Sequence, residues 1–222
     1  METYFKQQAI GANKRTRTRG ALIDGAIDVF AEKGFDEASI SEIAAVAGMA
    51  NGTFYNHFKD KEALAAATAS AIALEIAERL DERMVDLESG IERVVAASFA
   101  FIRLAAEHQP WGAVLLEQFQ RRPAAGAAAM EYMRADIQLA VEQRGLDVEV
   151  DDFLLEQLSA LMIAALRLQL GHGYQQAQLL RTCEYILRIL GLNPKQARQG
   201  VEGVTRHNLL GTSASLGNFL TA

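Results

Sequence analysis

The sequence predicts an all-α protein, and three observations lead to that prediction. The chain holds only three prolines in 222 residues. Alanine, leucine, glutamate and arginine dominate, and apolar residues recur at steps of three and four, the period of an amphipathic helix. No stretch alternates β-branched and polar residues as a half-buried strand does. We expect about nine helices, arranged as a small N-terminal three-helix domain and a larger helical domain.

The first expected helix runs from Thr16 to Lys33 and buries a face that includes Leu22 and Phe30. Gly34 follows it and supplies the left-handed backbone that commonly ends a helix. The next helix starts at Ser39, because Ser39 and Glu42 have the S-x-x-E spacing of a capping box. Gly48 ends this second helix after two turns.

A third short helix is expected from Asn51 to Phe58, and a long fourth helix from Asp60 to Met84. Phe54 and Phe58 stand at positions i and i+4, so they share one face and can anchor the third helix to the core. Five more helices are expected at 91–107, 111–119, 124–144, 151–170 and 175–190. Residues 193–222 lose the helical period, and we expect a peripheral helix followed by a tail.

Charge is distributed unevenly along the chain. The formal net charge is −6, which by itself argues against binding to nucleic acid. The N-terminal segment is nevertheless basic, with no acidic residue among Lys6, Lys14, Arg15, Arg17 and Arg19. An acidic body with a basic end fits a protein that contacts phosphates with that end only. A disordered, solvated tail is the alternative.

Other features exclude several classes of protein. No run reaches the ~18–20 apolar residues of a membrane span, and the N-terminus lacks the pattern of a signal peptide. We therefore expect a cytoplasmic protein with no membrane contact. Cys183 is the single cysteine, so a disulfide framework or a thiolate metal cluster is excluded. We expect no cofactor and no metal.

Residues 39–58 have the layout of a helix-turn-helix, in which the second helix enters the major groove of DNA. The turn falls at Gly48-Met49-Ala50, where glycine accepts a positive φ. Thr53, Tyr55, Asn56 and His57 lie off the face shared by the two phenylalanines. A generic helical hairpin fits the same spacing.

A longer, ordered motif distinguishes these alternatives. It comprises Phe30-Ala-Glu-Lys-Gly-Phe35, Ala38-Ser-Ile-Ser-Glu-Ile-Ala44, Ala47-Gly48 and Gly52-Thr-Phe-Tyr-Asn-His-Phe-Lys-Asp-Lys-Glu-Ala-Leu64. This motif closely resembles the DNA-binding domain of the TetR family of bacterial regulators. The resemblance covers residues 16–64, the DNA-binding domain. Residues 65–192 have the length and helical layout expected of that family's regulatory and dimerisation domain. A basic arm at 1–15 and a peripheral segment at 193–222 flank them.

The resemblance also implies a DNA-contacting set. Its members are Arg15, Arg17, Arg19, Ser39, Ser41, Asn51, Gly52, Thr53, Tyr55, Asn56, His57 and Lys61. Asn51 and Thr53 are the candidates for base edges, whereas Tyr55, His57 and Lys61 are candidates for the phosphate backbone. Ser39 has a capping role as well.

The expected helices at 151–170 and 175–190 are apolar on more than one side, so the core of their own chain can bury only part of their apolar surface. The residues expected to face a second copy are Leu158, Leu161, Ala165, Leu168, Leu179, Cys183, Ile186 and Leu190. Two helices from each partner would form a four-helix interface with two-fold symmetry. Complete burial of these residues within one subunit is the alternative.

A mixture of aromatic and polar residues in the middle of the chain could line a site for a small molecule. The candidates are Phe99, Arg103, His108, Trp111, Phe119, Met133 and Met162. An ordinary helical core has the same composition.

Together these features predict a ligand-responsive transcriptional regulator, most simply a repressor, that binds a palindromic operator as a homodimer and is released by a small-molecule effector. An activator and a DNA-binding scaffold that does not switch are the alternatives. The chain has none of the common catalytic motifs around its four histidines, so we do not expect an enzyme.

Overall fold

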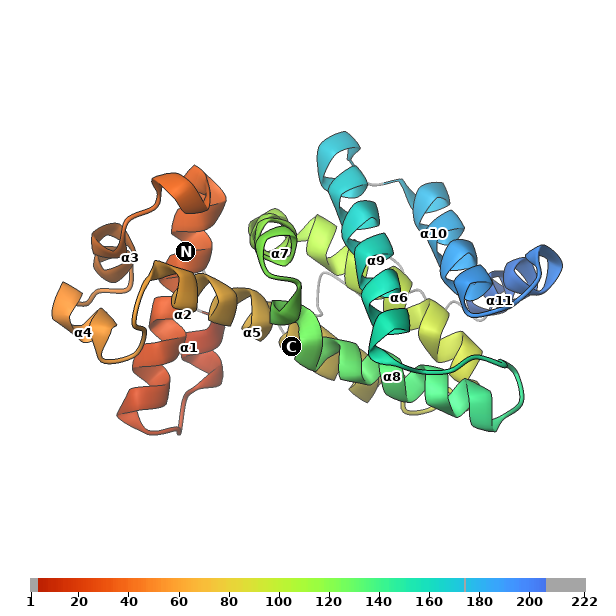
Figure 1. Ribbon diagram of the computed structural model, residues 1–222. Helices are drawn as coiled ribbons and strands as arrows, with labels where there is room; N and C mark the ends of the chain where they lie inside the picture. The colour runs from red at the N-terminus through yellow and green to blue at the C-terminus, as the bar shows by residue number, and fades with distance from the viewer. Residues whose placement is uncertain (1–3, 174, 207–222) are drawn as a thin grey trace. The chain divides into compact units, whose positions relative to one another are not determined.

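The computed structural model describes residues 4–173 and 175–206, and the predicted tail beyond residue 206 lies outside this range. Within the described residues the chain is helical and contains no strand, which confirms the all-α prediction. The helices are α1 (Tyr4–Gln8), α2 (Lys14–Glu37), α3 (Ile40–Val46), α4 (Asn51–Tyr55), α5 (Lys61–Arg83), α6 (Gly90–Glu107), α7 (Gln109–Arg121), α8 (Ala127–Glu142), α9 (Asp152–His172), α10 (Gln176–Ile189) and α11 (Pro194–Arg206), with a short 3-10 helix at Pro123–Gly126 (Figure 1).

Over the described residues these are eleven α-helices rather than about nine. Helix α1 lies in the predicted basic arm and was not expected, whereas α11 is the peripheral helix expected after residue 193. The helix start and stop signals were placed correctly: α2 breaks at Gly34 (φ 76°), and Gly48 (φ 72°) turns the chain after α3. Ser39 and Glu42 form the predicted capping box.

The chain folds into two compact units. The head unit comprises Met1–Ala73 and His108–Gly126, and the body unit comprises Leu74–Glu107 and Ala127–Ala222. Helix α7 therefore belongs to the head unit, where it packs on α2. Helix α5 begins in the head unit and ends in the body unit.

The core of the head unit forms around α2, whose residues from Gly20 to Ile27 are all buried. Phe54 from α4 and Leu64 from α5 are fully buried there as well. In the body unit, α6 is the central helix and packs against α8, α9, α10 and α11. Helix α6 buries most of its surface, as a helix covered on several sides must.

Helix α9 is long and apolar enough by composition to cross a membrane. It also contributes Leu158 and Leu166 to the core of the body unit, where it packs against α6 and α10. A core helix that is apolar on more than one side has the same length and composition, so this property does not distinguish a membrane-spanning helix from a buried one.

Candidate DNA-binding interface

The first helix of the motif, α3, is fixed at its start by paired hydrogen bonds. The backbone N–H of Glu42 donates to the Ser39 hydroxyl (3.2 Å), and the Ser39 N–H donates to the Glu42 carboxylate (3.0 Å). Lys33 donates to the same carboxylate (2.5 Å). The hydrogen bonds from Lys33 and Ser39 lower the pKa of Glu42 to about 2. The Ser39 side chain is thus used for capping, while Ser41 is exposed.

The second helix of the motif, α4, is anchored by two aromatic rings and leaves its other faces open. Phe54 and Phe58 are 0% and 5% exposed, and their ring centroids lie 5.9 Å apart. This confirms the anchoring face predicted from their spacing. The predicted DNA-contacting residues are exposed or half-buried around it: Asn51, Gly52, Tyr55 and Asn56 are exposed, and Thr53 and His57 are intermediate. Tyr55 is 59% exposed, which is unusual for a large aromatic side chain.

Gly52 lies in the first turn of α4, and a Cβ atom added to it would meet nothing within 4 Å. Glycine in a helix costs about 0.8–1 kcal/mol relative to alanine. No contact within the described residues explains why that position carries no side chain. A close approach of another molecule to the α4 backbone would explain it.

The start of α2 brings positive charge to the far end of α4. Arg15, Arg17 and Arg19 are exposed, and the Arg19 guanidinium lies 4.6 Å from the centre of the Phe58 ring. Burial, together with the positive charges of Arg15 and Arg19, lowers the pKa of His57. The structure therefore brings the predicted arginines and His57 into one neighbourhood.

Lys61, which the resemblance makes a candidate for phosphate contact, is hydrogen-bonded within the chain. Its ammonium donates hydrogen bonds to the backbone carbonyls of Phe35 (2.7 Å), Asp36 (3.2 Å) and Ala38 (2.7 Å). An ammonium has three protons to donate, and these acceptors can use all of them. In this structure the Lys61 ammonium therefore binds the end of α2. The resemblance gave the residue type, but the local turn determines what it contacts.

Lys59 is an exposed cation between α4 and α5, and it is absent from the DNA-contacting set predicted from the sequence. Its side chain is 81% exposed, and its ammonium lies 3.6 Å from the Asp60 carboxylate. It directly follows Phe58, the second anchor of α4. Its position shortly after α4, the second helix of the motif and hereafter the recognition helix, is the sequence signal that could have identified it as a DNA contact. Lys14, at the start of α2, is likewise exposed.

Helix α7 holds the turn that leads into the helix-turn-helix. The Glu117 carboxylate accepts from the Phe35 N–H (3.1 and 3.2 Å), and Arg121 pairs with Asp36 (2.8 Å). The Arg121 guanidinium also lies 4.9 Å from the centre of the Phe35 ring. Phe35 and Asp36 are thus held by α7 and, through Lys61, by α5. No sequence signal pointed to this junction, because its members are far apart in the chain.

The predicted effector residues fall in both units. His108, Trp111 and Phe119 lie in the head unit, on α7 or directly before it. The others lie in the body unit on the packed helices α6, α8 and α9, and are buried: Phe99, Arg103, Met133 and Met162. Arg103 is 4% exposed and pairs with Glu107 at 2.8 Å. A buried guanidinium is the polar feature of this otherwise apolar set.

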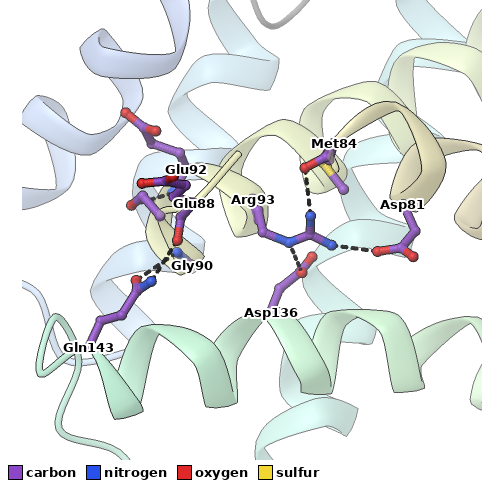
Figure 2. Close-up of polar contacts among 9 residues, drawn as sticks. Asp81, Met84, Glu88, Gly90, Glu92, Arg93, Asp136 and Gln143 are labelled. Atoms are coloured by element: carbon purple, nitrogen blue, oxygen red, sulfur yellow. Dashed lines mark hydrogen bonds and ion pairs between the residues drawn. The ribbon is translucent and has the colours of Figure 1, made fainter. Parts of the chain in front are cut away.

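A hydrogen-bond network in the body unit fixes the end of α5. Arg93 on α6 donates to Asp136 on α8 (2.5 Å), to Asp81 on α5 and to the Met84 carbonyl (2.7 Å) (Figure 2). Beside it, Gln143 of the segment after α8 accepts from the Gly90 N–H (2.9 Å) and donates to the Glu88 carbonyl (2.6 Å) (Figure 2). The α5–α6 turn is therefore held to α8 by polar contacts at both ends.

The structure also corrects most of the predicted dimer residues. In the chain alone, Leu158, Leu179, Cys183, Ile186 and Leu190 are at most 1% exposed. Ala165 is 5% exposed. Such side chains already lie in the core of their own subunit and have no surface left for a partner. Burial also raises the pKa of Cys183 to about 12, as expected for an inert thiol.

Leu161 and Leu168 of the predicted set remain accessible, with Leu168 45% exposed. Phe153, on the same helix, is 73% exposed, and Tyr185 and Ile189 on α10 are 40% and 41% exposed. The spacing of these residues places them on outer stripes of α9 and α10, which pack side by side. The periodicity showed that these helices are apolar on two sides, but it did not show which side faces inward.

An anchored α4 with an open polar face, beside a cluster of cations, defines a helix-turn-helix DNA-binding protein. Comparison with known proteins agrees. Residues 22–68 match the model of the bacterial regulatory proteins of the tetR family. The chain is 30% identical over 161 residues to the transcriptional regulator UidR of Escherichia coli (strain K12), covering 71% of this chain and 79% of UidR. It belongs to the TetR family and is a transcriptional regulator.

Other matches differ in extent. A fatty acid metabolism regulator protein of Bacillus subtilis (strain 168) is 33% identical over 88 residues, and the aligned region spans only 45% of its length. Among solved structures, RolR in complex with resorcinol superimposes with a TM-score of 0.69 at 27% identity, covering 85% of this chain and 94% of RolR. The similarity to RolR extends through both units.

Proposed function

We propose that the protein is a dimeric repressor that binds a palindromic operator through α4 and is released from it by a small-molecule effector. The observation that carries this proposal is the open polar face of α4, with the cations of α2 and Lys59 around it. Asn51 and Thr53 lie in the first turn and read base edges. Tyr55, His57, Lys59 and the α2 arginines bind phosphates and set the position of the helix.

The second element of the proposal is a homodimer formed by the outer stripes of α9 and α10. Apolar side chains remain exposed on both helices: Phe153 and Leu168, with the half-buried Leu161, on α9, and Tyr185 and Ile189 on α10. Exposed apolar side chains on neighbouring helices are typical of a protein–protein contact. A second copy covers them by pairing the same helices across a two-fold axis. Two heads bound to one operator explain why the site should be palindromic.

The third element is release by an effector. RolR is named with resorcinol as its ligand. By analogy, we assign to this chain a small, largely apolar molecule with a hydroxyl or carboxylate group. The apolar part would contact Phe99, Met133 and Met162, and the polar group would contact Arg103. A ligand shifts the protein off DNA only if it binds the unbound conformation more tightly.

Two connections support such a coupling. Helix α5 runs from the head unit into the body unit, where Arg93 fixes its end. Helix α7 directly contacts Phe35 and Asp36, just before the helix-turn-helix. A shift of either helix therefore reaches the start of α3. We assign repression because a bound dimer blocks a promoter by occupying it, whereas activation needs a further surface that contacts the polymerase.

Selection of duplexes from a random library by the full-length protein tests the proposal. We expect enrichment of an inverted repeat whose half-sites lie about one helical turn apart. Affinity should fall steeply with salt, because cations bind the phosphates. A reporter gene behind the selected site should be silenced by the protein. Equal binding to all duplexes would refute the proposal and favour a non-switching scaffold.

The effector is tested separately, with the selected duplex in hand. A library of small aromatic and fatty acids should contain compounds that raise the melting temperature of the free protein and release it from the duplex. An Arg103→Met variant should lose the response to these compounds and keep its affinity for DNA. Silencing that no compound relieves, or a reporter that is switched on by the protein, would overturn release or repression while leaving DNA binding intact.

A further inference from the structure

The N-terminal segment was expected to be a basic arm, but residues 4–8 form a helix that is docked on the head unit. The carboxylate of Asp24 on α2 accepts from the backbone N–H groups of Phe5 and Lys6, at 2.9 Å each. These N–H groups lie in the first turn of α1, where a helix has no acceptors of its own. Asp24 is 3% exposed, so this contact is part of the core.

Two further features show that the docking is built into the sequence. A Cβ atom on Gly20 would lie 2.6 Å from the Phe5 carbonyl oxygen, so only glycine lets α1 approach α2 this closely. Trp111 on α7 contacts both aromatic residues of α1, with ring centroids 5.3 Å from Tyr4 and 5.8 Å from Phe5. Helix α1 is thus held by a buried carboxylate, a close backbone contact and an aromatic cluster.

The chain then reverses between α1 and α2 through a compact turn. The N–H of Ile10 donates to the Gln7 carbonyl (2.9 Å), and the N–H of Ala12 donates to the Ala9 carbonyl (3.0 Å). Asn13 caps α2 by accepting from the Thr16 N–H (2.9 Å). We call residues 4–19 the α1–α2 hairpin, and residues 10–13 its tip.

The outer surface of this hairpin has the composition of a DNA contact. From Tyr4 to Ile23 the sequence holds no acidic residue and five cations, all of them exposed: Lys6, Lys14, Arg15, Arg17 and Arg19. Ile10 projects from the tip and is 79% exposed, the most exposed large apolar side chain of the described residues. An apolar side chain among cations suits the wall of a minor groove, where sugars lie between phosphates.

The tip also lies on the correct side of the head unit. Lys14 and Arg15 follow it in the chain, and the Arg19 guanidinium, one turn further along α2, lies 4.6 Å from the centre of the Phe58 ring. His57 and Phe58 follow the recognition helix. With α4 in a major groove, the start of α2 is therefore beside the phosphates that border that groove, and the tip comes immediately before it in the chain.

We propose that the α1–α2 hairpin is a second, preformed DNA-contacting element, in which Ile10 enters the flanking minor groove while Lys6 and Lys14 bind its phosphates. Asp24 and Gly20 are positioning residues: they hold α1, and through it the tip, without contacting DNA. This inference rests on the proposed function, since it needs α4 to be in the adjacent major groove.

Two variants test the hairpin on the duplex selected by the wild-type protein. Ile10→Glu places a charge on an exposed tip and leaves the docking of α1 intact. Asp24→Ala removes both acceptors of α1 and should release it. Trp111 is the sole tryptophan, so its fluorescence reports whether Tyr4 and Phe5 still cover it. Val85→Glu, at a side chain 77% exposed in the body unit, is the control for the added charge.

We expect Ile10→Glu to lower affinity at least tenfold with unchanged tryptophan emission, and to remove hydroxyl-radical protection from the minor groove flanking each half-site. Asp24→Ala should shift the emission and lower the slope of log affinity against log salt by about one for each phosphate that the hairpin no longer binds. Asp24→Asn keeps one acceptor oxygen, so its tryptophan emission and its salt slope should lie between those of the wild-type protein and Asp24→Ala. The preferred bases under α4 should not change in any variant.

The hairpin proposal is overturned if Ile10→Glu binds as tightly as Val85→Glu, or if Asp24→Ala shifts the emission while affinity stays at the wild-type level. Should Asp24→Ala fail to fold, Ile10→Glu and the flanking protection decide alone. Failure of the wild-type protein to select any duplex is a different result, because it would refute the proposed function itself.

Discussion

The ammonium of Lys61 lies 4.5 Å from the centre of the Phe35 ring and donates to the Phe35 carbonyl. The backbone N–H of Phe35 also donates to the Glu117 carboxylate on α7. Phe35 thus joins the start of α5 to α7 at the turn that precedes the helix-turn-helix. Lys61 therefore supports the geometry of the DNA-binding domain, and Lys59, 81% exposed, is the lysine that we propose to contact DNA.

This division of roles predicts opposite effects for the two lysines. Lys61→Met should lower the free energy of unfolding by about 2–3 kcal/mol, because it leaves carbonyls without a charged donor. Lys59→Ala should leave stability unchanged, weaken binding to all duplexes alike and lower the salt slope by about one. Chemical denaturation and salt titrations of DNA binding measure the two effects. A stable Lys61→Met variant with the defect predicted for Lys59→Ala would reverse the assignment.

Gly52 gives a second prediction, in which stability and function change in opposite directions. Gly52→Ala places a methyl group in open space and should stabilise the protein by up to about 1 kcal/mol. If the DNA backbone approaches α4 here, the same methyl group should lower affinity by tenfold or more. Thermal unfolding and operator titration of one preparation test both halves. Unchanged affinity would remove Gly52 from the interface.

Two features of the DNA-binding domain, its helix boundaries and the open face of α4, could be predicted from the sequence. Helix boundaries followed from local signals such as Gly34, Gly48 and the Ser39 cap, which depend on neighbouring residues only. The open face of α4 followed from the spacing of Phe54 and Phe58. Both were therefore readable before the fold was known.

Other features depend on residues that are distant in the chain, and these could not be predicted. Nothing near Lys61 indicates that the Phe35 carbonyl is within its reach, and nothing near Asp24 indicates that α1 docks on it. The inward face of α9 was also undetermined, because both of its sides are apolar. The spacing of apolar residues along a helix shows how its apolar faces are arranged around the axis, but it does not show which face packs on the core.

DNA binding should depend on pH through His57. Burial and the charges of Arg15 and Arg19 lower its pKa in the free protein, so it is largely neutral at pH 7. A bound phosphate adds negative charge and raises that pKa, so binding takes up a proton. Affinity should therefore rise as pH falls from 8 towards 6. His57→Gln should remove this rise in titrations at constant salt, and an equal pH dependence in that variant would exclude His57 as its origin.

The network around Arg93 predicts a large and pH-dependent loss of stability. Arg93→Ala leaves Asp136, whose side chain is 4% exposed, without its cation, and breaking such a buried pair costs about 3–5 kcal/mol. Burial already raises the pKa of Asp136, and removal of Arg93 raises it further. A carboxyl whose folded pKa is raised favours the folded state at low pH and loses that contribution as pH rises. The deficit of Arg93→Ala should thus be smaller at pH 5 than at pH 7, and a deficit independent of pH would contradict this origin.

The dimer gives the last prediction, because cooperative binding of two heads depends on it. A single head makes few base contacts, whereas two linked heads bind their half-sites with the second contact effectively intramolecular. If the outer stripe of α9 faces a second copy, Leu168→Glu and Phe153→Glu each place two charges in an apolar interface. Burying an unpaired charge costs several kcal/mol, which exceeds what a modest interface supplies.

Both side chains are exposed in the single chain, at 45% and 73%, so these variants should fold normally. We expect sedimentation to show monomers and operator affinity to fall by at least a hundredfold, while binding to an isolated half-site is unchanged. Val85→Glu, with 77% exposure outside α9 and α10, should remain dimeric. Ile186→Glu should instead unfold the body unit, because Ile186 is 1% exposed in its own core. Dimeric Leu168→Glu and Phe153→Glu variants with full operator affinity would place the interface on another surface of the chain.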